Sequence, residues 1–346
     1  MPSLQDSQTL RARATRRKAS SAVSIFTKRT AFKPFEYPDV IRFKDAIRQS
    51  YWVDTEYNFQ SDVHDFHVEL SAVEKSAIKN TLLAISQIEV SVKKFWGKLG
   101  DRFPKAEFDQ VGATFAESEV RHADAYSNLL DSLGLNNEFS MLLDNPVIQG
   151  RVDYLTKYLK RQAESSDEAY MLTLTLFSLF IENVSLFSQF AIITSFHKHR
   201  NLMKTVNNVV SATQKEETIH ALLGAEIIGY IKAENPEWFN EEFWKTLAKA
   251  SRKALDAECA IIDWIFEEGE LPFLAKDTLK EFIKHRLNES VKLIGGGKIF
   301  DIDLEKLEPL QWFNDSLIAD SNTDFFHTRP TTYTLNEQSV TADDLF

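Results

Sequence analysis

A chain of 346 residues can bury a sizeable core, either in one large helical domain or in two smaller ones. Its formal net charge of −11 argues against general nucleic-acid binding, because contacts to phosphates need a basic surface. A single cysteine, Cys259, excludes a disulfide framework within the chain and fits a reducing cytoplasm. Glycine and proline are scarce, with 11 and 9 occurrences, which favours helices over sheets.

Residues 1–35 are predicted to form a flexible basic tail. The first thirty residues carry seven Arg or Lys and one acid. Organelle transit peptides share this composition, but a solvated disordered segment has it too, and we favour the latter. Helical patterns fill most of residues 40–295. We therefore place one helical domain at residues 36–313 and a second flexible tail at residues 314–346.

Residues 171–193 form a nearly apolar stretch that is long enough to span a bilayer. Glu182 lies at its centre, and a charge at that depth is costly in lipid. A helix that is apolar on all sides also suits the middle of a large protein core. We predict a buried core helix here and no membrane span.

Two Glu-x-x-His motifs in separate parts of the chain are its most informative feature. In a helix, the glutamate and the histidine of such a motif point from the same face. One Glu from each of two helices and Glu-x-x-His from each of two others hold two metal ions inside a four-helix bundle. The predicted metal ligands are Glu89, Glu119, His122, Glu182, Glu217 and His220.

The four glutamates of this set fall on the apolar faces of their predicted helices. Glu89, for example, continues the helical spacing of Ile78, Leu82 and Ile85. One glutamate on such a face is more often an edge residue or half of a salt bridge. Four buried acids together need cations to compensate for them, and two metal ions supply that charge. One imidazole per ion among oxygen ligands suits Fe or Mn better than Zn or Cu.

With these groups placed, the chain resembles the small (beta) subunit of class I ribonucleotide reductases from about Trp52 onward. The resemblance implies an all-α, ferritin-like helical bundle with a dimetal-carboxylate site in its core, usually as a homodimer. It also implies that the metal centre makes an oxidising equivalent, which the large (alpha) subunit uses to reduce ribonucleotides to deoxyribonucleotides. The matching run is Glu89, then Ser118-Glu119-Val120-Arg121-His122-Ala123-Asp124-Ala125-Tyr126, then Glu182, then Glu216-Glu217-Thr218-Ile219-His220.

Tyr126 stands where most members of that family carry a stable tyrosyl radical. The family's first ligand is commonly Asp, whereas Glu89 resembles the manganese-dependent (class Id-like) subclasses. Thr213 places a hydroxyl in the pocket of that tyrosine. Lys93 follows Glu89 by one helical turn, so its ammonium either reaches the metal site or stays solvated. We therefore expect Mn/Mn in preference to Mn/Fe or Fe/Fe, with Tyr126 normally reduced.

The family's radical path runs from a tyrosine in the C-terminal tail through a tryptophan and an acid to the first histidine ligand. The matching residues are Tyr333, Trp52, Glu216 and His122. The acid is usually Asp, and Glu216 is one methylene longer. The alternatives are core packing for Trp52 and no role for Tyr333.

The acidic end of the chain, Ala342-Asp343-Asp344-Leu345-Phe346, resembles the peptide that docks family members on the alpha subunit. An unstructured segment with two apolar anchors can order in a groove of a partner. The main alternative is a related Mn/Fe oxidase that binds a long-chain ligand, which needs neither this tail nor the Trp52-Glu216-His122 relay. Acyl desaturases lack the Ser-Glu-x-x-His-x-x-x-Tyr run, and ferritins are shorter.

Overall fold

The computed structural model describes residues 24–160 and 166–323, with the side chains of 91–93, 154–160 and 318–323 outside that description. Within these ranges the regular structure is helical, apart from an isolated bridge between Leu271 and Leu274, which confirms the all-α prediction. The α-helices are α2 (Ile41–Gln49), α3 (Gln60–His64), α4 (Ala72–Trp96), α5 (Leu99–Arg102), α6 (Ala106–Leu133), α7 (Asn136–Ser140), α8 (Pro146–Lys160), α9 (Asp167–Leu176), α10 (Phe187–Arg200), α11 (Lys204–Glu234), α12 (Glu241–Ile265), α13 (Lys276–Leu293), α14 (Leu304–Leu307) and α15 (Gln311–Thr323).

Shorter helical segments join or interrupt these helices. Two of them are π-helical, η3 (Asp65–Glu69) and η5 (Phe177–Ser185), and the second lies between α9 and α10. The remainder are 3-10 turns: η1 (Pro38–Val40), η2 (Asp54–Glu56), η4 (Leu142–Asp144), η6 (Pro236–Phe239) and η7 (Glu308–Leu310).

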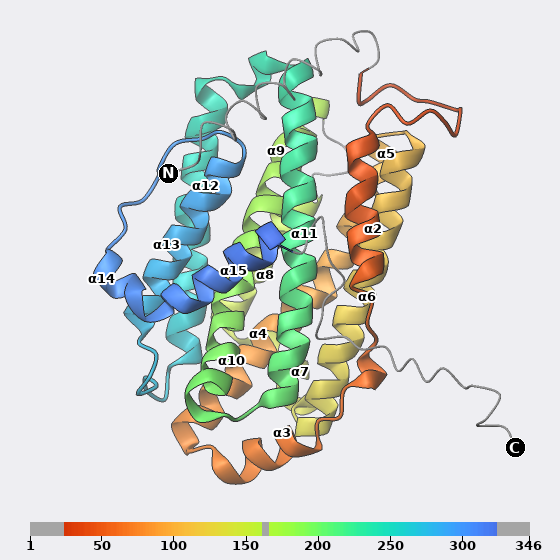
Figure 1. Ribbon diagram of the computed structural model, residues 1–346. Coiled ribbons are helices and arrows are strands. Elements are labelled where there is room, and N and C mark those ends of the chain that lie inside the picture. Colours follow the sequence, from red (N-terminus) through yellow and green to blue (C-terminus); the bar gives the residue numbers. More distant parts are fainter. Residues whose placement is uncertain (1–23, 161–165, 324–346) are drawn as a thin grey trace, which may run out of the picture.

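The long helices pack side by side into one bundle (Figure 1). Helix α4 packs along α6, and α11 packs against η5, α10 and α2. Helices α12 and α13 lie at one side of the bundle in this view, and α2 and α6 lie at the other. Local signals fix the ends of the two helices that matter most for the site. A capping box of Ser71 and Glu74 starts α4, and Gly134, in the left-handed conformation with φ of 72°, ends α6.

The apolar stretch around Glu182 is the core of the bundle. The continuous run from α9 through η5 to α10, Asp167–Arg200, is long and apolar enough to cross a membrane, but its most apolar window is fully buried inside the protein. This placement fits the predicted core helix. Every residue of η5 is buried, and a π-helix leaves some backbone carbonyls without their usual partners. Two guanidinium groups meet that need: Arg286 donates to the carbonyl of Asn183, and Arg151 donates to that of Ser185.

The predicted tail boundaries need correction at both ends of the domain. Ile25 is fully buried, and its N–H donates to Glu234 over 2.9 Å. Arg29 forms a bidentate ion pair with the buried carboxylate of Glu107. The predicted tail therefore contacts the bundle at Ile25 and at Arg29, while residues 30–34 are exposed. At the other end, α15 crosses the predicted boundary between residues 313 and 314.

A buried ion pair makes a strong stability prediction. The Nε atom of Arg151 lies 3.3 Å from Glu258, and both side chains are at most 1% exposed. Arg151→Met leaves that buried carboxyl group without its cationic partner, so we expect a loss of about 3 to 5 kcal/mol in the free energy of unfolding, measured in urea. Lys280→Met is the control, because its pair with Asp263 is partly exposed and is worth at most about 1 kcal/mol. Equal losses in the two variants would contradict the prediction.

Candidate metal centre

The six side chains predicted as metal ligands meet in the middle of the bundle. They come from four segments, α4, α6, η5 and α11, and each is at most 1% exposed. Their oxygen and nitrogen atoms fall into two groups, and within each group the atoms lie within 4.8 Å of one another. The first group is Glu89, Glu119, His122 and Glu217, and the second is Glu119, Glu182, Glu217 and His220. The shared members, Glu119 and Glu217, therefore lie between two ion-sized sites.

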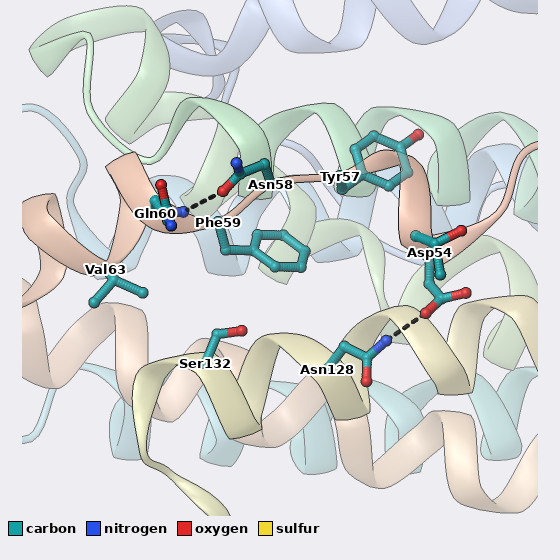
Figure 2. Close-up of a pocket in the computed structure, with 9 residues that line it drawn as sticks. Asp54, Tyr57, Asn58, Phe59, Gln60, Val63, Asn128 and Ser132 are labelled. Atoms are coloured by element: carbon teal, nitrogen blue, oxygen red, sulfur yellow. Dashed lines mark hydrogen bonds between the residues drawn. The ribbon is translucent and has the colours of Figure 1, made fainter.

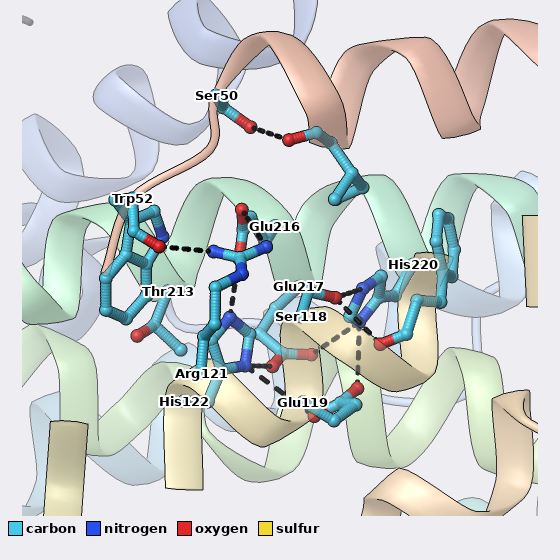
Figure 3. A network of polar contacts seen from close by, with 12 residues as sticks. Ser50, Trp52, Ser118, Glu119, Arg121, His122, Thr213, Glu216, Glu217 and His220 are labelled. Atoms are coloured by element: carbon cyan, nitrogen blue, oxygen red, sulfur yellow. Dashed lines mark hydrogen bonds and ion pairs between the residues drawn. The ribbon is translucent and has the colours of Figure 1, made fainter. Parts of the chain in front are cut away.

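Each histidine turns its Nδ1 atom toward the carboxylates (Figure 3). His122 Nδ1 lies 3.1 Å from Glu217 and 3.6 Å from Glu119. His220 Nδ1 lies 3.1 Å from Glu119 and 3.4 Å from Glu217. Each imidazole thus faces both shared acids. The symmetry of the two halves follows from the two Glu-x-x-His motifs on neighbouring helices.

Most of the ligand atoms of this cluster have no hydrogen-bond partner among the described residues. The buried atoms without a hydrogen-bond partner are both carboxylate oxygens of Glu89, Glu119 and Glu217 and the Nδ1 atoms of His122 and His220. Buried polar atoms are normally satisfied, and several orphaned acceptors aimed at one point indicate a cation. Carboxylate oxygens with one imidazole per ion match iron or manganese. The residues therefore fit a dimetal centre.

Without a cation, the cluster would hold protons in place of metal. Burial raises the pKa of Glu89 to about 8 and raises that of Glu217 well above its ordinary range. Burial acts against the charged form of His220, but the adjacent Glu119 carboxylate outweighs it and raises the histidine pKa to about 10. Burial also acts on Glu119 itself, yet the charged His220 beside it lowers the pKa of that carboxyl to about 2.

A second layer of side chains fixes the orientation of the ligands. Ser118 lies 3.0 Å from His220 Nε2, on the side of the ring away from the carboxylates. Trp96 donates its indole N–H to Glu182 over 3.0 Å. Outer partners of this kind hold metal ligands in the correct orientation. Ser118 belongs to the run that resembles the family, but the sequence did not indicate either of these contacts.

Two of the residues predicted for the radical path lie next to His122. Glu216 Oε2 lies 2.8 Å from His122 Nε2. The indole ring of Trp52 lies nearly parallel to the His122 ring, with centroids 5.8 Å apart and 14° between the planes. Trp52 Nε1 is buried without a hydrogen-bond partner, so the described residues contain no direct hydrogen bond from the indole to Glu216. Tyr333 lies outside the described residues.

Tyr126 is 1% exposed, and its hydroxyl donates to Thr213 over 3.4 Å. Burial raises the pKa of this phenol well above its ordinary value, and the nearby Glu89 adds to the effect. The phenol is therefore neutral in the ground state. The side chain of Lys93, the other residue predicted near this site, lies outside the described part of the protein, although its backbone belongs to α4.

A surface pocket of about 530 Å³ lies beside the relay and is separate from the metal centre (Figure 2). Its lining residues are Asp54, Thr55, Tyr57, Asn58, Phe59, Gln60 and Val63, together with Asn128 and Ser132 of α6. Asn128 donates a hydrogen bond to Asp54 across its wall. None of the six predicted ligands lines this pocket. Its wall residue Tyr57 meets the ring of Trp52 edge-on at 5.6 Å.

Comparison with known proteins agrees with this geometry. The family model described as "Ribonucleotide reductase, small chain" matches residues 29–309. The chain belongs to this family. The small subunit named "Probable ribonucleoside-diphosphate reductase small subunit 048L" of Invertebrate iridescent virus 3 is 28% identical over 336 residues, which cover 93% of this chain and 88% of the relative. The "Ribonucleoside-diphosphate reductase subunit beta" of Treponema pallidum is 21% identical and is aligned over 91% of this chain and 90% of its own length.

Solved structures show the same fold. The ribonucleotide reductase R2 subunit from Clostridium botulinum superposes with a TM-score of 0.72 at 16% identity, over 82% of this chain and 89% of that one. An R2-like ligand-binding oxidase with a Mn/Fe cofactor superposes with a TM-score of 0.65 at 19% identity, over 76% and 94%. These similarities confirm the predicted ferritin-like bundle.

Proposed function

We propose that this chain is the radical-generating beta subunit of a ribonucleoside-diphosphate reductase. The observation that carries the proposal is the pair of ligand groups that share Glu119 and Glu217 inside a fully buried cluster. Two transition-metal ions held by the six ligands would supply an oxidising equivalent, which the alpha subunit needs to reduce ribonucleotides. Membership of the small chain family and the contact between Glu216 and His122 support the same function.

The protein's own residues have distinct tasks in this function. The second layer, Ser118 and Trp96, orients the ligands, and the apolar bundle around them excludes water. Glu216 accepts the Nε2 proton of His122, which leaves Nδ1 free to bind an ion. Trp52 lies against the His122 ring at the outer side of the site and is the first aromatic residue on the way to the surface. Tyr333 would continue the path within the tail.

For the metals, we propose Mn/Mn, with Mn/Fe and Fe/Fe as the alternatives. Glu89 in place of the family's usual Asp supports manganese, and the Thr213 hydroxyl beside Tyr126 supports a tyrosine that stays reduced. The test is metal quantitation with EPR spectroscopy on protein loaded separately with Mn, with Fe and with both, followed by an assay with the alpha subunit. Activity with manganese and no tyrosyl signal is the expected result. Activity with iron alone and a tyrosyl radical would overturn it.

The second candidate function is a ligand-binding Mn/Fe oxidase, because such an oxidase shares the fold over 76% of the chain. An oxidase needs no partner subunit and no relay to the surface. The contact of Glu216 with His122 and the position of Trp52 favour the reductase subunit. Co-purification of a large reductase subunit would separate the two functions. A bound long-chain ligand in the purified protein would favour the oxidase.

The proposed partner is the alpha subunit, and the proposed assembly is a cytoplasmic homodimer that docks through its C-terminal tail. The docking peptide, residues 342–346, lies outside the described residues. Its deletion should lower nucleotide reduction to background while metal content stays at two ions per chain, because the peptide is remote in sequence from every ligand. A deletion variant that keeps its turnover with alpha would show that docking occurs elsewhere.

A further inference from the structure

Arg121 occupies an unusual position beside the metal centre. It sits in α6 directly before His122, and the whole residue is only 4% exposed. Burying a guanidinium group is costly unless its N–H groups find acceptors. All three nitrogens of Arg121 have one: Nε donates to Glu117 over 3.0 Å, Nη1 to the Trp52 carbonyl over 3.2 Å, and Nη2 to Glu216 over 3.1 Å.

These contacts make Arg121 the link between two parts of the relay. Glu216 is divided between two partners, with Oε1 on Arg121 and Oε2 on His122. Its extra methylene compared with the family's usual Asp gives the carboxylate more rotamers, and the two contacts together select one of them. The hydrogen bond between Arg121 and Trp52 is made to the Trp52 backbone carbonyl, since the indole N–H has no hydrogen-bond partner among the described residues. Figure 3 shows the guanidinium group between Trp52 and Glu216.

The guanidinium group also contacts the aromatic rings at the surface end of the relay. Its central carbon lies 5.4 Å from the centroid of the Trp52 ring and 4.7 Å from that of Tyr51, which is 50% exposed. Contacts at these distances have the geometry of cation–π pairs, which fix the position of a ring. Arg121 therefore touches the backbone and the ring of Trp52 at once, and lysine cannot reproduce such a planar, forked set of contacts.

We propose that Arg121 is the positioning residue of the relay, holding Glu216 against His122 and Trp52 against the His122 ring. The inference rests on the proposed function, because that function gives the relay its purpose. The contacts of Arg121 with Glu216 and Trp52 themselves do not depend on which metal is bound. Arg121 touches neither the metal ligands' donor atoms nor a substrate, so it acts through Glu216 and Trp52.

The first test uses NMR on zinc-loaded, diamagnetic protein. The proton between His122 Nε2 and Glu216 should resonate far downfield in the wild-type protein, and it should move upfield in Arg121→Gln, because the carboxylate is then free to turn. Glu216→Ala assigns the signal, because it removes the acceptor and with it the downfield shift. Asp124→Asn, an exposed change on the same helix, should leave it in place. An unchanged signal in Arg121→Gln would overturn the proposal.

The second test uses protein loaded with its active metals. Arg121→Gln should keep two ions per chain but lose about ten- to hundredfold in turnover with alpha, and Arg121→Lys should recover part of the loss. Adding Arg121→Gln to Glu216→Gln should cost clearly less than the sum of the two single losses, since part of the effect of Arg121 passes through Glu216 and only its hold on Trp52 is independent of it. Loss of the metals from Arg121→Gln, or additive losses in the double variant, would overturn the proposal. Absence of turnover in the wild-type protein would instead contradict the proposed function, while the NMR signal would still decide the role of Arg121.

Discussion

Glu119→Ala should empty both metal sites and abolish turnover. Glu119 belongs to both ligand groups, with one carboxylate oxygen facing each histidine: Oε2 lies 3.6 Å from His122 Nδ1 and Oε1 lies 3.1 Å from His220 Nδ1. Removing an outer partner of a metal ligand typically lowers the metal affinity ten- to a hundredfold. Loss of a shared ligand should therefore lower the affinity for each of the two ions by more than about a hundredfold. Metal content by mass spectrometry and nucleotide reduction with alpha measure the two losses.

The matched variant is Glu89→Ala, which removes a ligand found in one group only. It should weaken the binding of the ion beside His122 and leave the binding of the ion beside His220 unchanged, so the protein should retain about one ion per chain. Asp124→Ala, an exposed change on the same helix as Glu119, should keep both ions. If Glu119→Ala and Glu89→Ala lose metal to the same extent, Glu119 is not shared between the two ions.

Much of this site could be predicted from the sequence because its chemistry is tied to helical spacing. Glutamate and histidine three residues apart must share a helix face, and an acid such as Glu89 on an apolar stripe must be buried. The nearly apolar composition around Glu182 separately predicted a buried core helix there. Its π-helical form could not be predicted, because the extra residue per turn is stabilised by Arg151 and Arg286, which come from other helices.

The contacts of the second layer could not be predicted from the sequence, for a related reason. Arg121 occupies a variable position of the Glu-x-x-His motif, where a charged residue normally indicates a solvated face. Its burial depends on Trp52 and Glu216, which are distant in the sequence, with Glu117 one turn away as the only local sign. The contacts of Ile25 and Arg29 could not be predicted either, because a short basic stretch resembles a tail unless its partners on the bundle are known.

The metal-free protein should lose stability as the pH rises, in contrast to most proteins in this range. A carboxyl group whose pKa is raised on folding stabilises the protein below its unfolded pKa and ceases to do so as the pH passes its folded pKa. For Glu89, with a pKa raised from 4.5 to about 8, stability is lost between these two pH values. For His220, with a pKa raised from 6.5 to about 10, it is also lost as the pH rises between the two. Glu119, with its pKa lowered to about 2, acts oppositely, but only below pH 4.5.

Between roughly pH 5 and pH 7, the contribution of Glu89 alone should lower the free energy of unfolding by about 2.5 kcal/mol, as measured by urea titration of chelator-treated protein. Glu89→Gln should remove this part of the decrease in the free energy of unfolding with pH, because an amide needs no proton to stay neutral. Glu241→Gln, whose side chain is 82% exposed, should change nothing. Metal-loaded protein should show the reverse trend, since the ions replace the protons and bind more tightly as the pH rises. If the free energy of unfolding of the metal-free protein depends on pH equally in wild type and in Glu89→Gln, Glu89 is not the group that holds the proton. The two metals would then displace protons from Glu217 and the histidines instead.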